Sequence, residues 1–122
     1  MATTTLLAGD MGGTKTLLAL YESEAGQLRL LHQEGFRSGE WPSLEPMLVA
    51  FLNKRPADLP APAHACIAVA GPVRHREARI TNLPWRLREA DLARAAGMEQ
   101  LELVNDFGVL IYGLPHFDGN QQ

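Results

Sequence analysis

Two short stretches of this 122-residue chain combine residue types that could carry out phosphate chemistry. The first is Gly9-Asp10-Met11-Gly12-Gly13-Thr14, where a carboxylate lies within a glycine-rich segment. Backbone amides with little side-chain cover can approach an anion closely, and a carboxylate beside them can hold Mg²⁺ directly or through water. We therefore predict a phosphate site with Asp10 as the magnesium ligand and the amides near Gly12 to Thr14 facing the oxygens.

This glycine-rich segment does not match the two best-known phosphate-binding patterns. In a P-loop counted from Gly9, the second glycine would fall on Thr14, and a helix rather than a strand would follow Lys15. The dinucleotide-binding pattern also fails, because no helix is predicted to begin at these glycines. The segment equally fits an ordinary tight turn that uses glycine for a positive φ, so the residues alone leave both interpretations open.

The second stretch is Asn105-Asp106, directly after the predicted strand Leu101–Val104. A carboxylate at the end of a strand lies where open α/β sheets bind their ligands. Asp106 could accept the proton of an attacking hydroxyl, and the Asn105 amide could hold another hydroxyl. The alternative is that one of the two residues caps a helix predicted at 107–113, and the two roles are compatible.

The elements that would position these stretches follow from the apolar pattern. Three strands in an antiparallel meander are followed by helix, strand, helix, strand and helix, which predicts an α/β fold with a five-stranded mixed sheet flanked by helices. The predicted strands cover about 3–8, 16–21, 28–34, 64–70 and 101–104, with a possible short strand at 79–82, and the helices cover about 44–52, 88–96 and 107–113.

Composition restricts the function classes further. The chain is 46% hydrophobic and carries a formal charge of −3 with no basic stripe, which argues against nucleic acid as a partner. The start of the chain has no basic residues and only a short apolar run, so we expect neither a signal peptide nor a membrane span. The single cysteine, Cys66, lies in an apolar run and is expected to be a buried, reduced thiol, which favours the cytoplasm.

Four segments together resemble the bacterial glucokinase family. They are, in chain order, Leu7 to Thr16, Ala65 to Val73, Thr81-Asn82-Leu83-Pro84-Trp85, and Leu103-Val104-Asn105-Asp106-Phe107. The resemblance implies the architecture of the actin, hexokinase and Hsp70 superfamily, in which two ribonuclease H-like domains hold ATP and substrate in the cleft between them. Residues 1–122 would be the N-terminal small domain of such a kinase, with the second domain absent from this chain.

The resemblance also implies an activity, ATP-dependent phosphorylation of D-glucose at O6 in glycolysis, with ATP and Mg²⁺ as cofactors. By similarity, Gly9 to Thr14, including Met11, would receive the ATP phosphates, and Asp10 would be the Mg²⁺-linked carboxylate. Asn105 would bind a glucose hydroxyl, and Asp106 would bind the sugar and act as the catalytic base. The full-length protein would be a cytoplasmic homodimer, and the 122-residue chain alone would be inactive.

Two other functions remain open at this point. A sugar kinase of the repressor/ORF/kinase family shares the Asp-x-Gly-Gly-Thr and Asn-Asp patterns, although Ala70-Gly71-Pro72-Val73 and Asn105-Asp106-Phe107 favour glucokinase. A non-catalytic sugar-binding module could keep the fold without a second wall to the cleft. Lys15 departs from the family pattern, where many relatives carry Asn.

Overall fold

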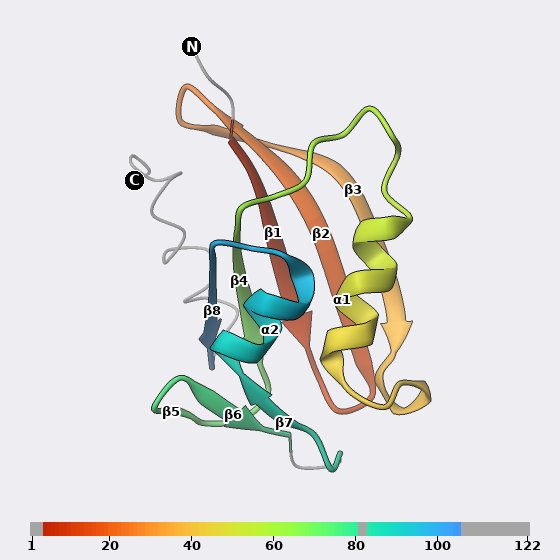
Figure 1. Ribbon diagram of the computed structural model, residues 1–122, viewed down its shortest axis with the longest axis vertical. Coiled ribbons are helices and arrows are strands. Elements are labelled where there is room, and N and C mark those ends of the chain that lie inside the picture. The colour runs from red at the N-terminus through yellow and green to blue at the C-terminus, as the bar shows by residue number, and fades with distance from the viewer. Residues whose placement is uncertain (1–3, 81–82, 106–122) are drawn as a thin grey trace.

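The computed structural model describes residues 4–80 and 83–105, and contains two sheets and two α-helices (Figure 1). The larger sheet has five strands in the order β3-β2-β1-β4-β8, and the smaller has three in the order β5-β6-β7. The elements are β1 Thr4–Met11, β2 Lys15–Glu24, β3 Gln27–Arg37, the 3₁₀ turn η1 Ser38–Glu40, α1 Leu44–Asn53, β4 His64–Val69, β5 Val73–Arg74, β6 Glu77–Arg79, β7 Arg86–Arg88, α2 Glu89–Ala96 and β8 Gln100–Val104.

The larger sheet confirms the predicted mixed five-stranded arrangement. Strands β1, β2 and β3 are antiparallel neighbours, whereas β4 runs parallel to β1 and β8 runs parallel to β4. The carboxyl ends of β1, β4 and β8 therefore meet at one edge of the sheet, the lower edge in Figure 1. The helix predicted at 107–113 lies outside the described residues.

The two faces of the larger sheet have different surroundings because side chains alternate along each strand. Leu7 and Met11 of β1 face α1 and α2 and are fully buried in the main core. Leu6 and Ala8 project from the opposite face into a smaller cluster with Cys66 and Ala68. The main core also contains α1 and α2 residues at helical spacing: Leu44, Met47, Leu48, Phe51, Leu52 and Leu92.

The smaller sheet was not predicted, apart from one short strand placed about two residues late. Its strands are two or three residues long, which is too short for an alternating pattern to be visible. The hairpin between β5 and β6 turns at His75 and Arg76, whose φ angles are 53° and 65°. Glycine or asparagine is the usual signal for such a turn, and neither is present.

The end of α2 shows why its glycine is needed. Gly97 has φ 68°, its amide donates to the Arg94 carbonyl, and the Met98 amide donates to the Ala93 carbonyl at 2.9 Å. This pair of bonds is the Schellman arrangement, and the buried Met98 supplies the apolar contact that accompanies it.

We expect Gly97→Ala to lower the free energy of unfolding by about 1 kcal/mol, because a Cβ is disfavoured at this φ. A Cβ at Gly97 would meet no described atom within 4 Å, so the cost is conformational. Urea unfolding followed by circular dichroism measures it. Gly39→Ala is the control, since its Cβ also meets no described atom and its φ is not left-handed. An equal loss in both variants would contradict the interpretation.

Cys66 is buried as predicted, and its surroundings disfavour the thiolate. Burial raises the pKa of this thiol from 9.0 to about 12, and the nearby Glu102 and Glu89 carboxylates add to the increase. Well below pH 9 the thiol is protonated in both the folded and the unfolded chain, so it contributes no pH dependence there.

Between about pH 9 and 12 the unfolded thiol ionises while the folded thiol does not, so we expect Cys66 to make the chain less stable as pH rises. The measurement is the free energy of unfolding at a series of pH values. Because other groups also titrate in this range, the Cys66→Ala variant serves as the reference, and its stability should fall less steeply. Identical slopes would show that the folded thiol ionises normally.

Candidate functional site

The parallel register brings the predicted site residues to the same edge of the sheet. Asp10 of β1 is level with Ala68 of β4, which in turn is level with Val104 of β8. Two strand spacings separate β1 from β8, roughly 10 Å. Asn105 follows Val104 directly, so Asp10 and Asn105 stand on either side of the end of β4, and both are exposed. Asp106 lies outside the described residues.

The segment Gly12 to Thr14 forms the tight connection between β1 and β2. The Gly12 amide donates to the Lys15 carbonyl at 3.0 Å and closes the turn. Among the described glycines, only Gly26 and Gly97 have a positive φ, so this turn does not use glycine for a left-handed conformation. Glycine at Gly12 avoids a tight contact, because a Cβ there would lie 3.2 Å from the Lys15 carbonyl oxygen.

Ser38 fixes the orientation of this turn, and it was not predicted. Its hydroxyl donates to the Gly12 carbonyl at 2.7 Å, and its amide donates to the Thr14 carbonyl at 2.9 Å. Since the Ser38 hydroxyl has one proton, the 2.8 Å contact between the two hydroxyls is a donation from Thr16 to Ser38. Ser38 and Thr16 are fully buried. No motif in the sequence marks Ser38, which lies 26 residues from the glycine it holds.

The hydrogen bonds from Ser38 to the turn, here called the Ser38 clamp, leave backbone amide donors of the turn available to a ligand. In a trans peptide the carbonyl and the following amide point in opposite directions, so the Gly13 amide points away from Ser38. Within residues 4–80 and 83–105, neither the Gly13 nor the Thr14 amide has a recorded hydrogen-bond partner. Unpartnered amides beside a carboxylate are the arrangement predicted for a phosphate site.

Gly9 allows β1 to pack closely between its neighbours. A Cβ at this position would lie 3.0 Å from Leu18 Cδ2 and 3.2 Å from two Ile67 carbons. A side chain at Gly9 would point into the main core, so Gly9 helps the site only by letting β1 pack closely. The next residue, Asp10, projects from the other face of the sheet. Met11 is buried in the core, so only its backbone can serve the site.

Two cations flank the turn on the same face as Asp10. Lys15 and Arg37 are directly opposite each other on β2 and β3, and both are exposed. Leu17 is level with Asp10 and two residues from Lys15, so these side chains share a face. A groove of about 600 Å³ begins here, lined by Thr14, Lys15, Gly35, Phe36 and Arg37.

The residues present fit a magnesium ion held mainly by its substrate. Within the described ranges, no three His, Cys, Asp or Glu side chains are grouped closely enough to hold a metal. Among the described residues, Asp10 supplies the carboxylate next to the turn. Mg²⁺ is commonly bound through one or two carboxylates together with phosphate oxygens and water, so a single exposed aspartate is sufficient.

No helix in the described part of the chain is long and apolar enough to cross a membrane.

Comparison with known proteins places this arrangement in a family. A family model described as Glucokinase matches residues 7–122. The chain is 44% identical over 113 residues to a glucokinase from Nostoc sp., covering 91% of this chain and 32% of the relative. It is 41% identical over 116 residues to one from Synechocystis sp., covering 88% and 33%. The chain thus spans about a third of the length of these curated relatives.

Solved structures agree. A glucokinase from an Antarctic psychrotroph superposes with a TM-score of 0.77 at 32% identity, covering 96% of this chain and 37% of that one. A glucokinase of the ROK family from Streptomyces griseus, solved with glucose and AMPPNP, gives 0.60 at 20% identity over 98% and 38%, which supports the fold alone. The predicted ribonuclease H-like, actin-like ATPase fold is therefore confirmed, and this chain belongs to the glucokinase family.

Proposed function

We propose that residues 1–122 are the N-terminal small domain of a two-domain glucokinase that transfers a phosphoryl group from MgATP to O6 of D-glucose. The observation that carries this proposal is the turn at Gly12 to Thr14, whose free amides lie beside Asp10 and across the end of β4 from Asn105. Family membership supplies the substrate class, because the relatives are named glucokinases.

In this proposal each residue has a separate task. The Gly13 and Thr14 amides donate hydrogen bonds to the phosphate oxygens, and the exposed Lys15 and Arg37 draw the polyphosphate toward the turn. Asp10 would hold Mg²⁺, which when bound supplies positive charge against the phosphate oxygens. Asn105 holds a glucose hydroxyl beside the reacting one.

Asp106 acts as the base. It takes the proton of the glucose 6-hydroxyl as that oxygen forms a bond to the γ-phosphorus, and the bond from the γ-phosphorus to the bridging oxygen breaks, so that ADP leaves. Such a transfer requires both substrates to be held in line, which a cleft with two walls provides. Because this chain spans about a third of its relatives, it would supply one wall, and we expect no turnover from the 122-residue chain alone.

The remaining expectations belong to the same proposal. The protein would act in the cytoplasm, in glycolysis, as a homodimer whose substrates are glucose and MgATP. The soluble composition and the single buried thiol are consistent with that compartment. Size-exclusion chromatography with light scattering on the full-length protein tests the dimer directly.

Replacing Asp106 tests the base. In a chimera that carries residues 7–122 in place of the matching segment of the Nostoc sp. glucokinase, we expect Asp106→Ala to lower kcat by about 10²–10⁴-fold, the contribution typical of a general base. A coupled assay of glucose 6-phosphate gives kcat, and calorimetry should still detect glucose binding.

Asp58→Ala is the matched control, because this exposed aspartate lies in the connection between α1 and β4. Unchanged turnover in Asp106→Ala would refute the assignment. If the chimera with the unaltered segment bound glucose and MgATP without turnover, a non-catalytic module would be the better description.

Replacing Ser38 tests the clamp. Ser38→Ala leaves the Gly12 carbonyl and the buried Thr16 hydroxyl without a partner, so we expect the free energy of unfolding to fall by about 1–3 kcal/mol. In the chimera, kcat/KM for MgATP should fall about tenfold or more while KM for glucose changes little, because the amides at the turn lose their orientation.

Ser43→Ala is the control for Ser38→Ala. Ser43 is half-buried before α1, and within the described residues its side chain makes no capping hydrogen bond. Its replacement should leave both stability and kinetics nearly unchanged. If Ser38→Ala reduced stability but moved both KM values equally, the serine would be a structural residue without influence on the phosphate turn.

A further inference from the structure

Positive charge is concentrated in the segment that forms the smaller sheet. Residues 73–88 contain five of the 11 lysines and arginines of the chain and a single acidic residue, Glu77, although the chain as a whole carries a formal charge of −3. The five are Arg74, Arg76, Arg79, Arg86 and Arg88. The proposed phosphate-transfer site uses none of these five arginines.

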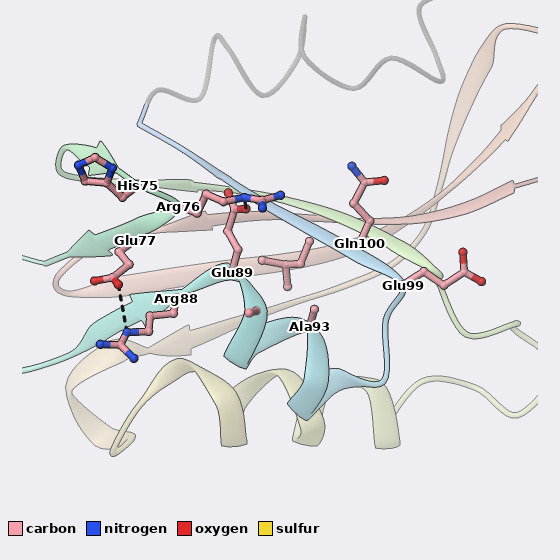
Figure 2. A pocket seen from close by; sticks show the side chains of 10 residues that line it. His75, Arg76, Glu77, Arg88, Glu89, Ala93, Glu99 and Gln100 are labelled. Atoms are coloured by element: carbon pink, nitrogen blue, oxygen red, sulfur yellow. Dashed lines mark hydrogen bonds and ion pairs between the residues drawn. The ribbon is translucent and has the colours of Figure 1, made fainter.

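The strand register gathers four of these arginines on one face. Ala78 and Leu87 are paired across β6 and β7 and are buried against the main core. The alternate positions therefore project outward. Arg79 is directly opposite Arg86, and Glu77 is flanked by Arg74 on β5 and Arg88 on β7. Figure 2 shows the ion pair between Glu77 and Arg88.

The positive charge on this face is only partly compensated. Glu77 binds Arg86 and Arg88, each at 3.2 Å, so one carboxylate serves two guanidinium groups. Within the described residues, Arg74 and Arg79 have no recorded ion pair. Like charges directly opposite each other on neighbouring strands are destabilising, so the pair Arg79 and Arg86 does not contribute to folding.

Arg74 and Arg79, which have no recorded ion pair, line a groove together with Arg86, which shares Glu77 with Arg88. This groove has a volume of about 430 Å³, within the range of small-molecule sites, and receives Arg74 from β5, Arg79 from β6 and Arg86 from β7. The full lining is Pro72, Arg74, His75, Glu77, Ala78, Arg79 and Arg86. Guanidinium groups bind phosphate through two parallel hydrogen bonds, and several from neighbouring strands match one phosphate group better than scattered lysines would.

We propose that this groove binds a small organic phosphate at a site separate from the turn at Gly12 to Thr14. The two sites share no lining residue. The recognised chemistry is a phosphate dianion, carried either by a sugar monoester or by a nucleotide polyphosphate. The proposal stands on the arginine face and does not depend on the kinase activity of the protein.

The test is a titration of the ¹⁵N-labelled 122-residue chain at low ionic strength, followed by amide chemical shifts. Glucose 6-phosphate probes the monoester, inorganic pyrophosphate probes the polyphosphate, and glucose is the uncharged control. We expect saturable shifts at residues 73–88 with at least one phosphate and none there with glucose, and the shifts should shrink as salt is added. The phosphate that binds more tightly shows whether the groove favours a monoester or a polyphosphate.

The double variant Arg79→Gln/Arg86→Gln should weaken this binding about tenfold or more, as expected for the loss of charge-assisted hydrogen bonds. Arg94→Gln is the matched control, since Arg94 is an exposed arginine of α2 paired with Asp91. A well-dispersed spectrum of the double variant establishes that it folds. Shifts at the Gly12 and Gly13 amides report the phosphate turn independently.

Any of the following results would overturn the proposal: no saturable shift at residues 73–88 with either phosphate, the same affinity in the double variant, or an equal loss in Arg94→Gln. Binding of an acidic peptide at this face without binding of either phosphate would also overturn it, and would assign the face to a protein partner instead.

Discussion

Strand β4 pairs in parallel with β1 on one side and with β8 on the other, and this pairing determines where the candidate site residues lie. It sets Asp10, Ala68 and Val104 at one level, so that the residues following β1 and β8 open onto the same edge. Strands of parallel sheets cannot be joined by tight turns, so the chain must cross over between β1 and β4 and again between β4 and β8. These crossovers contain α1 and α2, and the same helices cover the main core.

The turn at Gly12 to Thr14, which we propose binds phosphate, depends on that sheet and on a buried polar network attached to it. Gly9 lets β1 lie closely against β2 and β4, and Gly12 leaves room for the Lys15 carbonyl. Ser38 then donates hydrogen bonds to two of the turn's carbonyls, those of Gly12 and Thr14. Buried hydroxyls such as those of Ser38 and Thr16 are costly when unpaired and specific when paired, so the network sets the turn in one orientation.

The smaller sheet has one face in the main core and one charged face that is exposed. Its inner side chains, Ala78 and Leu87, join the main core, while its outer side chains are nearly all arginine. Glu89 connects it to the rest of the domain. Its carboxylate pairs with Arg76 at 3.0 Å (Figure 2) and accepts a hydrogen bond from the Leu103 amide at 2.9 Å. That second bond also satisfies a backbone donor of β8, which with β3 is one of the two edge strands of the larger sheet as described.

The sequence by itself determined the five strands of the larger sheet, both described helices and the identity of Asp10 and Asn105 as candidate site residues, because apolar spacing and strand ends are local properties. It did not reveal Ser38, the pairing of Lys15 with Arg37, or the arginine face of the smaller sheet. Each of these joins residues through hydrogen bonds or strand register across a distance in the chain. A local sequence pattern does not specify which distant segment will pack or pair with it. These three features were therefore decided only by the tertiary structure.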